Sequence, residues 1–396
     1  MTSRGSISLP RLFAAVTTLA LAWLVTPAPA VAQNAYITNN SGDTNSTNVN
    51  NVFVIDTTKN AVIATVTVGS RPFGVAVTLD GSKAYVANTF DNTVSVIATA
   101  TNTLVATVNV GGFPFGVAAA PDSSKVYVSN AGSGSVSVID TGSNTVIATI
   151  QNAGFIPSGI AVSKDGSTVY VTDQDTNSGG DKVTVIATAS NTVVGTIAVG
   201  GAPVGIAVSP TGSKLYVVNG NDKSVSVIDT GSNTVVATID LSPQSPFEVA
   251  VTPDGSKAYV TLSNSDVAVI DTASNTFTTI PLGSGTAPYG IAFTSDGSRA
   301  YVTDINNGNV LVLDTGTNTV TGSAIPVGGV PVAFGLFIQP TQAKPPNSFA
   351  GTPGTKNCIG NSVSALSNKF GTFTAAANAF GESVKALQQS IAAFCA

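Results

Sequence analysis

Residues 72–110 read PFGVAVTLDGSKAYVANTFDNTVSVIATATNTLVATVNV, and this stretch decides the fold. Short runs rich in β-branched residues alternate in it with polar turns, as is typical of strands. Between the first two runs, Asp80 and Gly81 give a two-residue hairpin signal. The stretch therefore predicts four antiparallel strands. The four runs are 74–78, 84–88, 93–97 and 104–110.

The same pattern repeats along the chain, marked by a Tyr-Val phrase that occurs seven times. A phrase like Pro72-Phe73-Gly74 and a turn like 140–144 keep step with it. Four antiparallel strands every forty-odd residues are typical of a β-propeller blade. The sequence therefore predicts an all-β fold, a seven-bladed β-propeller over residues 33–340. The tyrosines of the phrase are Tyr36, Tyr85, Tyr127, Tyr170, Tyr216, Tyr259 and Tyr301.

The two ends of the repeat region predict how the ring closes. The first unit lacks an opening strand and begins at Tyr36, whereas 332–338 is an opening strand with nothing after it. We expect these pieces to complete one blade, with three strands from the start and one from the end. Such 3+1 ring closure removes the exposed sheet edges that favour aggregation.

The phrase Tyr170-Val171-Thr172 and its six relatives, together with the Pro-Phe-Gly phrase, resemble the YVTN-repeat, YncE-like β-propeller proteins. The resemblance covers Ala35 to about Pro340. It implies an exported or surface propeller that acts as a binding or interaction scaffold. It does not name a ligand.

Residues 1–32 have the pattern of a signal peptide: a positive start with Arg4 and Arg11, an apolar run, and small residues before Gln33. The alternative is a membrane anchor, but the run is short for a bilayer and is followed by prolines. We therefore expect a periplasmic or extracellular protein with no membrane span after cleavage. We expect it to be a monomer.

The C-terminal residues predict a separate small unit. Residues 341–357 are rich in Pro, Ala and Thr and read as a linker. Residues 358–396 carry apolar side chains at helical spacing, which predicts a short helical module. Cys358 and Cys395 are the only cysteines, so we expect a disulfide that staples it. The module is either a stabilising appendage or a docking unit on a tether.

Composition excludes several kinds of function. The chain contains no histidine, which excludes a Ser-His-Asp triad and imidazole-bound metals. Its net charge is −5, and −7 once the two arginines of the predicted leader are removed, so we expect no nucleic-acid binding. We identify no catalytic residues. A lactonase-like hydrolase that uses the central mouth of the propeller is the alternative.

Two departures from the repeat suggest a ligand-binding site. Glu248 stands where other units have Gly, and Arg71 precedes Pro72 where others have Gly, Ala or Phe. We expect both at the mouth of the central channel, either binding a ligand or merely solvated. The expected partner is a protein or a cell-envelope carbohydrate. The aromatic candidates are Phe73, Phe115, Phe247 and Tyr289, and the loop-face candidates are Asn88, Asp91, Asn130, Asn219 and Asp222.

Residues 173–181, DQDTNSGGD, predict a calcium loop. Oxygen-bearing side chains at its positions 1, 3, 5 and 9 can converge on one cation, and Ca²⁺ takes many oxygen ligands. Ser178 replaces the usual Gly at position 6. The alternative is an elongated Asn/Asp hairpin, and we expect no other cofactor. The predicted ligands are Asp173, Asp175, Asn177 and Asp181.

Overall fold

The structure is a computed structural model that describes residues 33–40, 50–174, 180–340 and 391, all within one compact unit. The predicted signal peptide, the linker, Cys358 and Cys395 lie outside the described residues. Only Ile391 of the predicted C-terminal module is described, so that module remains a prediction. No helix in the described residues is long and apolar enough to cross a membrane.

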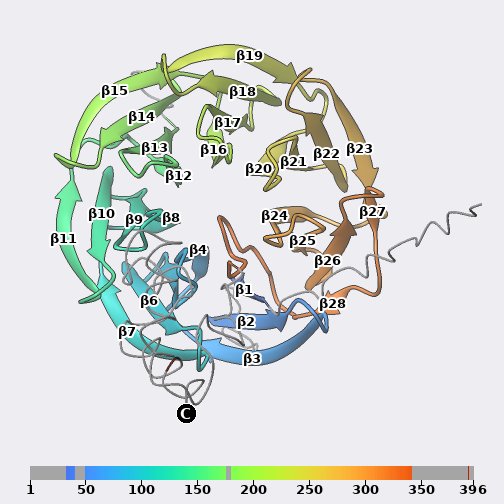
Figure 1. Cartoon of the computed structure of the whole chain (residues 1–396), viewed down its shortest axis with the longest axis horizontal. Helices are drawn as coiled ribbons and strands as arrows, with labels where there is room; N and C mark the ends of the chain where they lie inside the picture. The colour runs from blue at the N-terminus through green and yellow to red at the C-terminus, as the bar shows by residue number, and fades with distance from the viewer. Residues whose placement is uncertain (1–32, 41–49, 175–179, 341–390, 392–396) are drawn as a thin grey trace, which may run out of the picture. The chain divides into compact units, whose positions relative to one another are not determined.

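Seven antiparallel sheets stand around a common axis, which confirms the seven-bladed β-propeller (Figure 1). In each four-stranded blade the first strand lies innermost and the fourth lies at the rim. Blade 1 holds β1 (Asn34–Asn39), β2 (Asn51–Asp56) and β3 (Ala61–Thr67); blade 2 holds β4 (Pro72–Val77), β5 (Lys83–Asn88), β6 (Thr93–Ala98) and β7 (Thr103–Asn109); blade 3 holds β8 (Pro114–Ala119), β9 (Lys125–Asn130), β10 (Ser135–Asp140) and β11 (Thr145–Ile150); blade 4 holds β12 (Pro157–Val162), β13 (Thr168–Asp173), β14 (Lys182–Ala187) and β15 (Thr192–Ala198). Blade 5 holds β16 (Pro203–Val208), β17 (Lys214–Asn219), β18 (Ser224–Asp229) and β19 (Thr234–Asp240); blade 6 holds β20 (Pro246–Val251), β21 (Lys257–Leu262), β22 (Asp266–Asp271) and β23 (Phe277–Pro281); blade 7 holds β24 (Pro288–Phe293), β25 (Arg299–Asp304), β26 (Asn309–Asp314), β27 (Thr319–Val320) and β28 (Ile325–Pro326).

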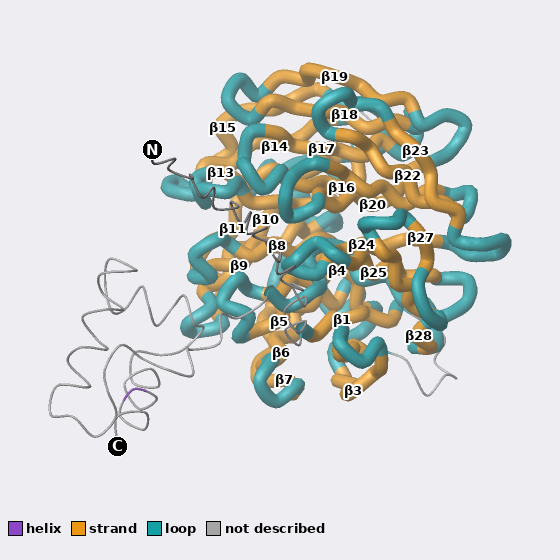
Figure 2. The backbone as a smooth tube through the Cα atoms, turned by 45° about the vertical axis from the view of Figure 1, so that its right-hand side comes forward, coloured by secondary structure: helices purple, strands orange, loops and turns teal. Residues whose placement is uncertain are grey.

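The two faces of the ring carry different loops, and Figure 2 shows these loops in teal between the strands. Each inner strand starts after the connection from the preceding blade and ends at the hairpin that leads to the second strand. We call the end with the blade-to-blade connections the connection face. We call the end with the first hairpins, such as 78–82, the turn face. Every inner strand therefore runs from the connection face to the turn face.

Where the third residue of an inner strand is glycine, the next blade lies too close to admit a side chain. A Cβ atom added to Gly74 would lie 2.1 Å from the backbone oxygen of Phe115 in the next blade. At Gly159 the corresponding distance to the oxygen of Val204 is also 2.1 Å. The glycine of the Pro-Phe-Gly phrase therefore serves close packing between blades.

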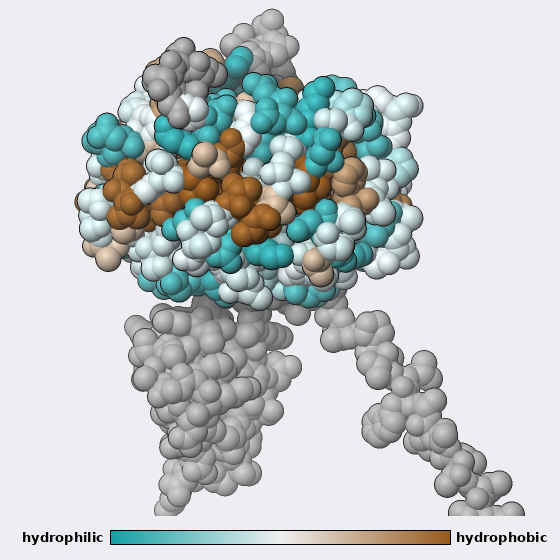
Figure 3. All heavy atoms as spheres, turned by 90° about the horizontal axis from the view of Figure 1, so that it is seen from above, coloured by the Kyte–Doolittle hydropathy of each residue, from teal (hydrophilic) through white to brown (hydrophobic). Residues whose placement is uncertain are grey.

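The outer strands complete the blades and carry apolar side chains at the surface. In β15 and β19, Val194 and Val236 are each more than half exposed. Space-filling atoms show such residues as an interrupted apolar band along the rim (Figure 3). The exposed apolar residues of the outer strands are Val62, Ile63, Leu104, Val105, Ile147, Val193, Val194, Val235, Val236, Phe277 and Val320.

Residues 331–338 lie beside β1, the first strand of the chain. The amide of Tyr36 donates to the oxygen of Phe337 at 2.9 Å, and the amide of Val332 donates to the oxygen of Thr38 at 3.0 Å. On its other side the segment meets β4, because the amide of Val75 donates to the oxygen of Phe334 at 2.9 Å. The end of the described propeller thus lies between the inner edges of blades 1 and 2.

The tyrosine of the repeated phrase joins each of four blades to the next. Its ring is buried, and its hydroxyl reaches an asparagine in the outer hairpin of the neighbouring blade, where that residue has a positive φ. Tyr301 makes this bond from blade 7 to Asn60 of blade 1 at 2.6 Å and also donates to the oxygen of Thr57 at 3.1 Å. The other pairs are Tyr36 to Asn102, Tyr85 to Asn144 and Tyr259 to Asn318.

The threonine two residues later makes a second bridge, close to the axis. In blade 4 the hydroxyl of Thr172 accepts from the amide of Gly159 at 2.7 Å and donates to the oxygen of Val204 in blade 5 at 3.0 Å. Equivalent bridges are made by Thr38, Ser129, Thr261 and Thr303. The repeated phrase therefore encodes contacts between blades as well as a strand within each blade.

The tyrosine bridges make a testable prediction at the junction of blades 7 and 1. Tyr301→Phe removes a buried hydroxyl and leaves Asn60 without that donor, so we expect a loss of about 1–3 kcal/mol in the free energy of unfolding. Tyr170→Phe is the matched control. The hydroxyl of Tyr170 makes no hydrogen bond with the described residues, so its removal should cost less stability than Tyr301→Phe does. Urea unfolding of the two variants measures both. Equal losses would show that the bridge does not stabilise the ring.

Candidate functional site

Five aromatic rings meet at the axis near the connection face. Four come from the second residue of an inner strand, and the fifth, Phe334, comes from the segment beside β1. The ring centroids of Phe73 and Phe115 lie 4.2 Å apart, and those of Phe247 and Tyr289 lie 5.5 Å apart in a stacked arrangement. Phe73 also meets Tyr289 edge-on at 5.7 Å. The four aromatic candidates predicted from the sequence are therefore brought together, and they form one cluster across the channel.

Glu248 follows Phe247 directly and lies between this cluster and the turn face. The expectation that it stands at the mouth of the channel is wrong, because only 3% of its surface is exposed. It occupies the third position of its inner strand, where most other blades have glycine. Its amide donates to Thr261 Oγ1 at 3.1 Å, whereas its Oε2 is buried without a hydrogen-bond partner in the described residues.

Burial determines the charge of this carboxyl. Removal from water raises the pKa of Glu248 well above its ordinary value, and the amide of Val249 offsets only part of that rise. Burial, together with the nearby Glu248, also raises the pKa of the Tyr289 hydroxyl. Burial therefore favours the neutral form of this carboxyl, which can donate a hydrogen bond.

Arg71 lies apart from Glu248, on the surface of the connection face. Its guanidinium carbon stands 4.5 Å from the centroid of Phe90, and Phe90 meets Phe113 edge-on at 5.6 Å. Both phenylalanines are more than half exposed. Arg71 and Phe113 each have φ of 52°, a left-handed conformation that costs a non-glycine residue about 1–2 kcal/mol. Phe90 and Phe113 were not among the sequence candidates, although Phe113 occupies the position that corresponds to Arg71.

The asparagines predicted to contact a partner do not lie at the surface, so that prediction is wrong. Asn88, Asn130 and Asn219 are fully buried. The amide group of Asn88 donates to Thr93 Oγ1 and Ser95 Oγ, both at 2.9 Å. These asparagines end the second strand and hold the loop beneath the surface, so they stabilise the connection face without lining it. Asp91 and Asp222 are exposed there, and Asp91 accepts from the amide of Ser70.

Asp173, the first predicted calcium ligand, is buried and already has several partners. Its Oδ1 accepts from the amides of Phe155 and Ile156 at 2.7 and 2.9 Å, and its Oδ2 lies 3.2 Å from Lys182 Nζ. Asp175 and Asn177 lie outside the described residues. Asp181 has a buried Oδ1 with no hydrogen-bond partner in the described part of the chain. The calcium site stays a prediction.

No protein-family model matches the chain, and no curated protein matches it. Several solved structures do match. A chain of hydrazine synthase from Kuenenia stuttgartiensis is 26% identical with a TM-score of 0.62; the match covers 66% of this chain and 88% of that one. A functionally unknown protein from Desulfotomaculum acetoxidans is 20% identical with a TM-score of 0.63, over 78% and 100% of the two chains. The "putative 6-phosphogluconolactonase" of Bacteroides fragilis is 17% identical with a TM-score of 0.63, over 76% and 97%.

These matches support the propeller fold. The last two are under 25% identical and therefore show the fold alone. The protein is a seven-bladed β-propeller with an aromatic cluster across its axis, a buried carboxyl beside that cluster, and an exposed Arg-Phe cluster on the connection face.

The buried carboxyl predicts how stability depends on pH. The folded protein keeps the Glu248 proton that the unfolded chain loses above pH 4.5, so the free energy of unfolding falls as the pH rises from 4.5 toward the raised pKa. Glu248→Gln removes this loss. We expect its advantage over the wild type to grow by up to about 1.4 kcal/mol per pH unit in that window, measured by urea unfolding at pH 4 and pH 8.

Asp240→Asn serves as the control of opposite sign. The amide of Ser242 and its hydroxyl hold the pKa of Asp240 low, so this carboxylate contributes stability above its unfolded pKa and loses it in acid. Its removal should therefore cost stability at pH 8. If Glu248→Gln behaved like Asp240→Asn, the carboxyl would be ionised in the folded protein and the argument from burial would fail.

Proposed function

We propose that this protein is a binding scaffold whose connection face receives a protein or a cell-envelope carbohydrate. The observation that carries the proposal is the exposed cluster of Arg71, Phe90 and Phe113. Arginine and aromatic side chains dominate the binding energy of known interfaces. Exposed phenylalanines held in place by a cation-π contact and by left-handed backbone lose little conformational freedom on binding. The cluster is therefore well suited to a partner.

Three further proposals describe the protein around this face. It belongs to the YVTN-repeat, YncE-like family, which is supported by the contacts between blades that its repeated phrase makes. Its ring closes by the 3+1 arrangement, which is supported by the hydrogen bonds of residues 331–338 to β1. It lies in the periplasm or at the cell surface, which is supported by the leader-like pattern of residues 1–32, and it acts there as a monomer.

A lactonase-like hydrolase remains the second candidate, and the B. fragilis match does not favour it because that match shows the fold alone. Glu248 is the carboxyl such an enzyme would use near the axis. Assays of the purified protein with lactones separate the two proposals. Lactone turnover by the wild type that is lost in Glu248→Ala would show that the protein is an enzyme and would contradict the scaffold proposal.

The binding proposal predicts which side chains hold the partner. We expect Phe90→Ala with Phe113→Ala to weaken binding at least about thirtyfold, since loss of an interface hot spot costs about 2 kcal/mol or more. Phe277→Ala is the matched control, because that ring is exposed on the outer strand β23, away from the connection face. The measurement is retention of fractionated cell-envelope proteins and polysaccharides on the immobilised protein. Equal retention by both variants would contradict the proposal.

We also propose that the loop at 173–181 binds calcium, supported by the unpartnered buried Oδ1 of Asp181. At a hundredfold excess over the dissociation constant, a single site adds about 2.7 kcal/mol to the free energy of unfolding. Calcium should therefore raise the melting temperature of metal-stripped protein, and magnesium should do less. Asp175→Ala should abolish the calcium effect. The same melting temperature with and without millimolar calcium would show an ordinary hairpin.

A further inference from the structure

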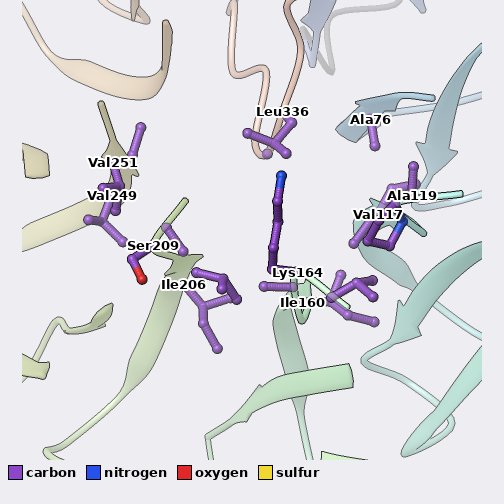
Figure 4. A pocket seen from close by; sticks show the side chains of 18 of the residues that line it. Ala76, Val117, Ala119, Ile160, Lys164, Ile206, Ser209, Val249, Val251 and Leu336 are labelled. Carbon is purple, nitrogen blue, oxygen red and sulfur yellow. The ribbon is translucent and has the colours of Figure 1, made fainter. Parts of the chain in front are cut away.

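A cavity of about 240 Å³ lies inside the ring on the turn side of Glu248. Its walls are the last residues of the inner strands of blades 2 to 6, together with Ile291 of β24 and the segment beside β1. Almost all of the wall is small and aliphatic, as at Ile160, Ile206 and Val249 (Figure 4). At roughly 30 Å³ per water-sized group, the cavity has room for about eight non-hydrogen atoms. An apolar cavity of this size suits one small ligand.

One cation enters this apolar space. Lys164 begins the first hairpin of blade 4, and its side chain rises into the cavity with its amino group facing Leu336 (Figure 4). Its Nζ makes no hydrogen bond or ion pair with the described residues. The corresponding residues of blades 2, 3 and 5 are Leu79, Pro121 and Pro210, so the lysine is a departure from the repeat.

Neither the acidic residue next to Lys164 in sequence nor the one in the cavity wall neutralises this lysine. Asp165 turns to its own hairpin, where its Oδ1 accepts from Ser163 Oγ at 2.6 Å and from the amide of Ser167 at 3.0 Å. Glu248, which also lines the cavity, is 97% buried and has an unpartnered Oε2. Its burial raises the pKa of the Glu248 carboxyl and so favours the form that does not repel an anion.

We propose that this cavity binds a small aliphatic carboxylate, with the alkyl chain among the inner strands and the carboxylate on Lys164 Nζ. An alkyl chain matches walls that offer dispersion contacts and almost no hydrogen bonds. A carboxylate matches a single unpaired ammonium at the open end, where the partly hydrated charge can form a charge-assisted hydrogen bond. This site lies on the opposite side of the aromatic cluster from the Arg-Phe cluster, so it is independent of the proposed scaffold function.

Titration calorimetry of the purified protein with butanoate, hexanoate, octanoate and decanoate tests the proposal. Each buried methylene should tighten binding about fourfold, at roughly 0.8 kcal/mol per group, until the cavity is full near octanoate. Octanol should bind at least about tenfold more weakly than octanoate, because it lacks the charge. Octylamine should bind more weakly still, because its charge has the same sign as Lys164.

Two variants separate the two parts of the site. Lys164→Ala should weaken octanoate at least about tenfold and leave octanol unchanged, whereas Lys223→Ala, on the connection face, should change neither. Ala207→Phe should fill the cavity and abolish binding of both, and a thermal melt checks that this variant folds. The proposal is overturned if octanoate gives no binding at millimolar concentration, if octanol equals octanoate, or if Lys164→Ala binds octanoate as well as the wild type.

Discussion

The structure depends on how closely adjacent inner strands approach one another at the axis. At Gly74 and Gly159 a single added carbon would lie 2.1 Å from a backbone oxygen of the next blade, so these strands approach their neighbours this closely only because they carry no side chain there. Backbone oxygens at such a contact need donors, and the hydroxyl of Thr172 and its equivalents supplies them. Farther from the axis, where the sheets diverge, the longer side chain of Tyr85 or Tyr301 spans the gap. The contacts between blades that depend on glycine, threonine and tyrosine thus follow one another outward from the axis.

This close packing explains why a side chain at position 248 alters the structure along the axis. A side chain at the third position must occupy space that other blades fill with backbone, and it does so as a buried carboxyl without a partner for Oε2. The aromatic second residues cover it from the connection face. On the turn side the aliphatic ends of the inner strands leave a cavity. The axis is therefore divided into an aromatic layer and an aliphatic layer, with the carboxyl between them.

The sequence predicted the fold well because each blade repeats the same local signals. The strands of 72–110 begin and end within about two residues of the observed ones, and the Asp-Gly hairpins lie where expected. The site was harder to predict, because exposure at the axis depends on packing between residues far apart in the chain. Glu248 and Asn88 are polar and stand near loops, which suggests surface positions, yet both are enclosed by neighbouring blades or loops. Phe90 and Lys164 belong to no sequence motif. Only the folded ring places Phe90 beside Arg71 and Phe113, and Lys164 at the cavity.

In a repeat protein, function is best sought in the departures from the repeat. Seven blades share one backbone and one set of contacts between blades, so a position that serves only stability is under the same physical demand in each blade. Arg71, Lys164 and Glu248 do not meet such a demand: each introduces a charge or a buried polar group where most other blades have a small or apolar residue. Two of them carry a local cost, left-handed backbone at Arg71 and a desolvated carboxyl at Glu248. Gly or Pro at these positions, as in other blades, would avoid such a cost. A binding site at these positions would explain why the cost is kept.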